Sequence, residues 1–204
     1  SCYDKAIQIN PNYSDAYNNK GNTLKDLKRY DKAILNYDKA IKIKSNHYDA
    51  YNNRGIALHD LKLYEEALVS FDKALSIKSD HAYAHNNKGN VLKDLKKYDK
   101  ALSCYDKAIQ INPNFADGYN NKGNALKDLE SYDDALVNYE KVLKLELDYE
   151  YILGKVLHTQ MFLCSWNNFY SKTKKINNAL NMKSKIIEPF PSLGILDNPV
   201  FLKK

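Results

Sequence analysis

Residues 17–27 read YNNKGNTLKDL, and this stretch returns three times further along the chain. The copies read YNNRGIALHDL at 51–61, HNNKGNVLKDL at 85–95 and YNNKGNALKDL at 119–129, so the step is 34 residues each time. Outside the stretch, the same step relates Tyr30, Tyr64, Tyr98 and Tyr132, and also Ala33, Ala67, Ala101 and Ala135. Several sets of like residues that recur at the same interval identify tandem structural repeats.

Each repeat is predicted to contain two amphipathic helices. Tyr17, Gly21 and Leu24 lie at helical spacing, and a second helical series runs through Ala33 and Tyr37. A single helix pair cannot cover its own apolar face, so neighbouring repeats must stack on one another. The sequence therefore predicts an all-α solenoid.

The sequence also indicates where the helices end and where the two helices of a repeat pack closely. We expect the first helix to end near Lys28 and Asp31 to cap the second helix. Pro11 and Pro113 mark turns between repeats, because proline cannot continue a helix. The lack of a side chain at Gly21 would let the two helices of a repeat approach each other closely.

This pattern of Gly21, Leu24, Ala33, Tyr37 and Ala40 resembles the tetratricopeptide-repeat family. The resemblance implies a right-handed superhelical solenoid of helix-turn-helix repeats, whose first helices line a concave face that binds protein or peptide. The expected repeats span residues 14–47, 48–81, 82–115 and 116–149. Lys20, Arg54, Lys88 and Lys122 depart from the family pattern, which has leucine at that position, and the usual closing proline occurs only at Pro11 and Pro113.

The two ends of the chain fall outside the four full repeats. Residues 1–12 read SCYDKAIQINPN, identical to residues 103–114, so we expect residues 1–13 to be the second helix of a truncated repeat. Residues 150–204 are expected to form capping helices and the start of a junction to a missing domain. A first capping helix is expected over 150–164 and a second over 167–182. The exposed end helices could also support homo-oligomers.

Composition and charge argue against some classes of binding partner. The net charge of +6 is uneven, because residues 150–204 carry +5 and residues 1–149 only +1. A repeat region so close to neutral argues against nucleic acid as a partner. No apolar run reaches the roughly 20 residues that cross a bilayer, so no membrane contact is expected. Three widely spaced cysteines without a C-x-x-C pair favour a reducing, intracellular and cytoplasmic setting.

The candidate binding residues are asparagines of the first helices. An amide side chain both donates and accepts, so a row of amides can hold the backbone of an extended peptide whatever its side chains. The predicted peptide-binding residues are Asn18, Asn19, Asn22, Asn52, Asn53, Asn86, Asn87, Asn90, Asn120, Asn121 and Asn124. The alternative is that repeat duplication copied polar surface residues along with the fold. Lysines and aspartates beside the row are typical of a solvated face.

No catalytic residue, cofactor site or metal site is predicted. Tyrosine is abundant, but most tyrosines fall in packing columns. His81 and His85 are four residues apart, yet His81 falls in a turn and His85 replaces a packing tyrosine. No group of titratable residues indicates an active site, so the chain itself is not expected to be an enzyme.

The last quarter carries a second resemblance. The segment YILGKVLH at 151–158, Cys164-Ser165-Trp166, and the turn residues at 189–193 and 197–199 resemble the junction between repeats and catalytic domain in SPINDLY-like, O-linked N-acetylglucosamine transferase family proteins. The resemblance implies that the parent protein is a nucleotide-sugar-dependent protein glycosyltransferase whose repeats select substrates. The alternative is a free-standing adaptor for complex assembly or self-association.

Overall fold

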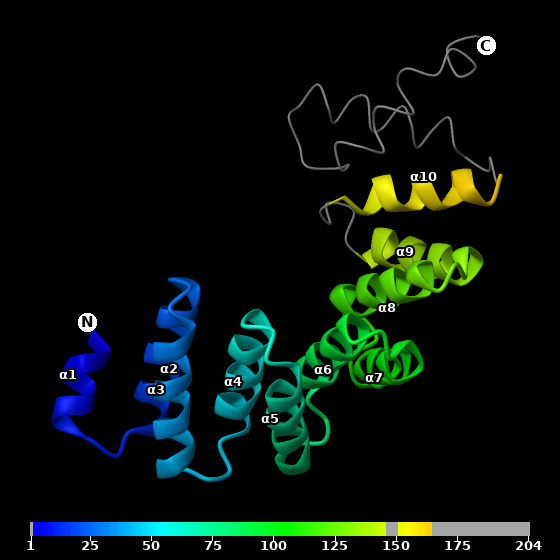
Figure 1. Ribbon diagram of the computed structural model, residues 1–204. Helices are drawn as coiled ribbons and strands as arrows, with labels where there is room; N and C mark the ends of the chain where they lie inside the picture. Colours follow the sequence, from blue (N-terminus) through cyan, green and yellow to red (C-terminus); the bar gives the residue numbers. More distant parts are fainter. Residues whose placement is uncertain (1, 146–150, 165–204) are drawn as a thin grey trace, which may run out of the picture. The chain divides into compact units, whose positions relative to one another are not determined.

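The computed structural model describes residues 2–145 and 151–164, and every regular element in these ranges is an α-helix (Figure 1). The helices are α1 (Cys2–Ile9), α2 (Ser14–Asp26), α3 (Tyr30–Ile43), α4 (Tyr48–Asp60), α5 (Tyr64–Ile77), α6 (Ala82–Asp94), α7 (Tyr98–Ile111), α8 (Ala116–Asp128), α9 (Tyr132–Leu145) and α10 (Ile152–Phe162). This order confirms the prediction of an all-α chain of tandem helix pairs.

The chain divides into two compact units, Ser1–Asn112 and Pro113–Lys204. In the first unit, α2 packs on α3, α4 on α5 and α6 on α7, and successive pairs meet through α3 with α4 and α5 with α6. In the second unit, α8 packs on α9 and α9 packs on α10. Each unit is thus held together mainly by contacts between helices that are neighbours in the sequence, as stacked repeats require.

A glycine in each first helix allows the close approach of the second helix. A Cβ atom at Gly21 would lie 2.5 Å from Cε1 of Tyr37, and one at Gly55 would lie 2.7 Å from Cε1 of Phe71. The rings that press against the four glycines are fully buried; they are Tyr37, Phe71, Tyr105 and Tyr139. The ring therefore fills the space that a larger residue in the first helix would need.

The apolar core runs from one helix pair to the next. Ala33 and Tyr37 of α3 form one cluster with Ala57 of α4, so the cluster joins two repeats. A second cluster joins Phe71 of α5 to Val91 of α6 in the same way. The core is continuous within the first unit because no helix pair covers its own apolar face.

The turn between the two helices of a repeat contains a residue with left-handed backbone. The φ angles of these residues are +57° at Lys28, +61° at Lys62, +57° at Lys96 and +60° at Glu130. In the first repeat, the Arg29 N–H donates to the Leu24 carbonyl at 2.8 Å, and the Lys28 N–H donates to the Lys25 carbonyl at 2.7 Å. These two bonds make a Schellman motif, which ends α2 at the place the sequence predicts.

The expected cap of the second helix is wrong. Arg29 occupies the N-cap position of α3, and its side chain makes no capping bond. Asp31 lies inside the first turn, because the Schellman motif lets α3 begin at Tyr30, two residues earlier than a cap at Asp31 would allow. Its carboxylate there still interacts favourably with the positive end of the helix dipole.

Basic residues at the leucine position of the family pattern form ion pairs with the preceding helix. The Lys20 ammonium lies 2.7 Å from the Asp4 carboxylate, and Arg54 Nε lies 2.8 Å from that of Asp38. Lys88 pairs with Asp72 in the same manner. Each of these three basic residues thus reaches the second helix that precedes its own first helix, a contact that the constant spacing of 16 residues could have revealed.

The last described helix packs on α9 but departs from the repeat pattern. Leu157 stands where the step of 34 residues requires glycine, and it is fully buried together with Ile152 and Val156. The helix expected over 167–182 and the junction residues after Cys164 lie outside the described residues. Within the described ranges, no helix is both long and apolar enough to cross a bilayer.

Candidate functional site

The predicted asparagines lie on the first helices α2, α4, α6 and α8, and we call them the amide row. Two of them are adjacent on each helix, and on α2, α6 and α8 a third follows one turn later. The first member of each pair is buried; these residues are Asn18, Asn52, Asn86 and Asn120. The second member is exposed in Asn19 and half-buried in Asn53, Asn87 and Asn121. The row therefore reaches solvent mainly through this second column.

In the first unit the amides bond to one another across repeats. Asn53 Nδ2 donates to Asn18 Oδ1 at 3.1 Å, and Asn87 Nδ2 donates to Asn52 Oδ1 at 3.2 Å. Within α4, Asn52 Nδ2 donates to Asn53 Oδ1 at 3.3 Å. The bonds between repeats run in one direction, from α6 to α2, so the amides of Asn52 and Asn53 each donate one bond and accept another. Sequence analysis missed this bonding, although the amides recur at the repeat step.

The third asparagine of a first helix accepts a hydrogen bond from a core tyrosine. The Tyr37 hydroxyl donates to Asn22 Oδ1 at 2.9 Å, and burial of this ring raises the pKa of its phenol well above the usual value. The Tyr105 hydroxyl makes the same bond to Asn90 at 2.9 Å. In the second unit, the Tyr139 hydroxyl donates to Asn124 at 2.9 Å. These three asparagines thus have a structural partner already.

In the second unit the row continues onto α10. Lys155 stands 34 residues after Asn121, in the column of the half-exposed asparagines. Its ammonium donates to Asn120 Oδ1 at 2.8 Å and to Asn124 Oδ1 at 3.2 Å. It also lies 5.8 Å from the centre of the Tyr139 ring. Lys155 was not predicted as part of the row, but counting one more repeat step would have found it.

The charged residues beside the row pair with one another. His59 Nε2 lies 2.7 Å from Asp94 Oδ2, which joins α4 to α6. On α2, the Lys25 ammonium lies 3.5 Å from the Asp26 carboxylate. Such exposed pairs contribute at most about 1 kcal/mol each. They are consistent with the solvated face expected from the sequence.

The two histidines with metal-like spacing have other partners. His81 Nδ1 accepts the Ala84 backbone N–H at 3.0 Å and so caps α6. His85 Nε2 lies 3.0 Å from the Ser79 carbonyl, and burial lowers the pKa of this imidazole. Among the described residues, no group of three or more His, Cys, Asp or Glu side chains is arranged to hold a metal ion.

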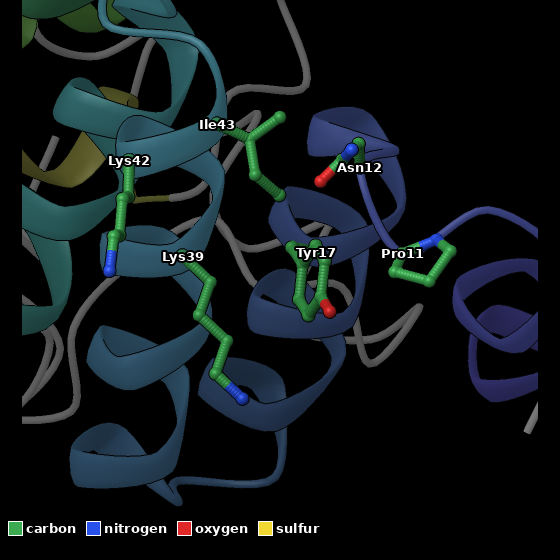
Figure 2. A pocket seen from close by; sticks show the side chains of 6 residues that line it. All are labelled: Pro11, Asn12, Tyr17, Lys39, Lys42 and Ile43. Atoms are coloured by element: carbon green, nitrogen blue, oxygen red, sulfur yellow. The ribbon is translucent and has the colours of Figure 1, made fainter.

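A surface hollow lies between the turn before α2 and the end of α3 (Figure 2). Its described lining residues are Pro11, Asn12, Tyr17, Lys39, Lys42 and Ile43. The Lys39 ammonium lies 5.7 Å from the centre of the Tyr17 ring. The hollow is wide open, and none of the predicted peptide-binding asparagines lines it.

Comparison with known families decides the classification. A family model described as tetratricopeptide repeat matches residues 14–47, 48–81, 82–115 and 116–149. The chain belongs to the tetratricopeptide-repeat family. Four contiguous matches cover the helix pairs from α2 to α9, so the tetratricopeptide repeats include every predicted member of the amide row. No curated protein matches the chain.

Solved structures share this tetratricopeptide fold. A crystal structure of MamA is 25% identical, with 70% of this chain and 84% of that chain covered and a TM-score of 0.63. YrrB, described as a tetratricopeptide protein with an unusual peptide-binding site, is 22% identical, with 95% and 97% covered and a TM-score of 0.66. PilF of Pseudomonas aeruginosa is 20% identical, with 86% and 80% covered and a TM-score of 0.75.

Proposed function

We propose that this tetratricopeptide-repeat chain is a scaffold that binds extended polypeptides along the amide row. The supporting observation is the hydrogen bonding of Asn53 and Asn87. Both side chains are half-buried, and each donates one amide N–H to another asparagine of the row. A primary amide has two N–H groups, and the second N–H of each has no partner among the described residues. These groups would donate to the backbone carbonyls of a bound peptide.

The hydrogen bonds inside the row favour such binding. Asn53 is fixed on both sides, because its amide donates to Asn18 and accepts from Asn52. A donor already held in one orientation loses little side-chain entropy when a ligand arrives. The row would therefore bind the backbone of a peptide whatever the peptide's side chains are. YrrB, which shares the fold, is described as having a peptide-binding site, and this supports the same class of ligand.

The test compares two double variants of the full chain. Asn53→Ala with Asn87→Ala removes both outward donors, whereas Asn36→Ala with Asn46→Ala removes amides outside the row as a control. Binding of fluorescein-labelled unstructured peptides is measured by anisotropy, and equal folding is checked by circular dichroism. We expect the row variant to bind at least about tenfold more weakly, at roughly 1 kcal/mol per lost hydrogen bond. Equal affinity of the two variants would overturn the proposal.

A finer version makes this chain the substrate-recognition region of a SPINDLY-like protein O-glycosyltransferase. Its support is the sequence resemblance at 151–158, a stretch that lies largely in α10 and carries Lys155 at the end of the row. The coding sequence beyond Lys204 tests it. A nucleotide-sugar-binding domain encoded there would support the finer version, and any other continuation would refute it.

The second candidate is an adaptor that assembles complexes or associates with itself. In α1, none of the residues is buried, and the Ile9 side chain is 86% exposed, so an apolar surface faces solvent there. Sedimentation velocity over a range of concentrations tests self-association, and a single monomeric species at all of them would refute it. The free thiols of Cys2, Cys104 and Cys164 fit the reducing, cytoplasmic setting proposed for either function.

A further inference from the structure

The second repeat differs from the others at two positions that touch each other in the fold. In repeats one, three and four, a tyrosine hydroxyl of the second helix donates to an asparagine of the first helix at 2.9 Å. In the second repeat, Phe71 replaces the tyrosine and Ile56 replaces the asparagine. The hydrogen bond has been exchanged for an apolar contact, and Ile56 packs against the cluster that contains Phe71 and Val91.

Each of the two replacements would cost stability if it occurred without the other. A tyrosine hydroxyl facing Ile56, or an asparagine facing Phe71, would be a half-buried polar group deprived of its partner, at a cost of about 1 to 3 kcal/mol. Replacing both partners by apolar groups of similar shape is nearly neutral. The paired change therefore alters the surface that the row presents without disturbing the packing below it.

At the surface, Ile56 forms an apolar step in a polar row. It is half-buried on α4, with Asn52 and Asn53 one turn before it and His59 one turn after it. The equivalent places on the neighbouring first helices of the same unit hold Asn22 on α2 and Asn90 on α6. Of these three equivalent side chains, only Ile56 lacks hydrogen-bonding groups.

We propose that a polypeptide bound along the amide row places an aliphatic side chain against Ile56. This inference rests on the proposed function and adds sequence selectivity to it. Amide donors read only the backbone, whereas the apolar step distinguishes an aliphatic side chain from a polar one. First helices of adjacent repeats lie roughly 10 Å apart, which corresponds to about three residues of extended peptide. The ligand class is thus an extended segment with one aliphatic residue, flanked by polar residues about three positions away on each side.

The experiment uses the full chain and two paired variants that copy pairs already present in it. Ile56→Asn with Phe71→Tyr recreates the pair of the other repeats and removes the apolar step. Asn90→Ile with Tyr105→Phe adds a second apolar step on α6. The probes are fluorescein-labelled peptides of about 15 residues, long enough to span the first helices of the first unit. They consist of Gly, Ser and Asn and carry no leucine, one central leucine, or two leucines spaced three apart.

We expect the unaltered chain to bind the one-leucine peptide about fivefold more tightly than the leucine-free peptide, as partial burial of one leucine predicts. The Ile56→Asn, Phe71→Tyr variant should bind both peptides equally. The Asn90→Ile, Tyr105→Phe variant should prefer the two-leucine peptide over the one-leucine peptide. An unchanged leucine preference in both variants would overturn the inference.

The remaining outcomes separate this inference from the proposed function. Binding of all peptides with equal affinity by the unaltered chain would overturn the role of Ile56 and leave backbone binding by the row intact. Binding of none of them would overturn both. Urea midpoints of the two variants close to that of the unaltered chain would show that any change in preference comes from the surface and not from lost stability.

Discussion

At the residue scale, the close contact of a glycine with an aromatic ring holds each repeat together. A Cβ at Gly89 would lie 2.6 Å from Cε1 of Tyr105, and this ring is fully buried. A neighbouring atom at this distance must move, and a buried ring has little room to do so. The glycine is therefore required for its small size, since no glycine among the described residues has a positive φ angle.

We predict that Gly89→Ala lowers the free energy of unfolding. Alanine forms helices better than glycine, so helix propensity alone would stabilise α6 by up to about 1 kcal/mol. Overpacking against Tyr105 opposes this gain and costs about 1 to 3 kcal/mol, so we expect a net loss. Urea unfolding followed by circular dichroism measures the change.

A second substitution provides the control for this steric account. Gly89→Ala combined with Tyr105→Leu leaves more room for the new methyl group, so the glycine change should cost less in that background than alone. If Gly89→Ala is as stable as the unaltered chain, the contact does not limit packing.

Cys104 is predicted to be the slowest of the three cysteines to react. Burial raises the pKa of its thiol, whereas Cys2 and Cys164 are exposed. The thiolate is the reactive form, so a raised pKa lowers its fraction at neutral pH. Modification by a thiol reagent, followed by peptide mass spectrometry, should label Cys104 last and with a rate profile displaced to higher pH. Labelling of Cys104 together with the other two, in the folded chain, would contradict this.

At the scale of the helix pair, the turn carries strain that the sequence does not relieve. The Schellman position prefers glycine, but three of the four turns hold lysine at this position. A left-handed backbone costs a residue with a Cβ roughly 1 kcal/mol or more, so glycine would remove this strain. A glycine in place of Lys62 would also be more flexible in the unfolded chain, which reduces part of the gain.

We predict that Lys62→Gly raises the free energy of unfolding by about 0.5 to 1 kcal/mol. The matched control is Lys73→Gly, an exposed position inside α5, where glycine should lower stability by about 1 kcal/mol. Urea titrations of both variants give the comparison. A loss of stability in both would show that the turn is not strained by its side chain.

At the scale of the whole molecule, contacts join sequence neighbours. Within Ser1–Asn112, apolar clusters, ion pairs such as that of Arg54 with Asp38, and amide bonds such as that of Asn53 with Asn18 link one repeat to the next. Stability of such an array is approximately a sum over repeats and their interfaces. The first unit should therefore not depend on distant parts of the chain.

We predict that residues 1–112 fold when expressed alone. Circular dichroism should show a helical spectrum and a cooperative urea transition, with an m-value smaller than that of the full chain because less surface is exposed on unfolding. A spectrum of an unfolded chain, or a transition without cooperativity, would refute this and show that the second unit is required.

Much of the fold could be predicted from single columns of the sequence. The step of 34 residues defined the repeats, and the small and aromatic columns at Gly21 and Tyr37 defined the helix packing. The N-cap of α3 was misplaced by two residues, because the Schellman motif at Lys28 lets the helix begin at Tyr30. For the candidate site, the column of asparagines was visible, but the partners of their amides were not.

The sequence by itself determined the all-α class, the repeat length and the identity of the polar column, because helical periodicity and repeat period are properties of neighbouring positions along the chain. Only the tertiary structure decided which amide groups bond to each other. Asn18 and Asn53 are 35 residues apart, and their bond exists only after two repeats have stacked. An amide can donate or accept in several directions, so its residue type alone does not specify its partner.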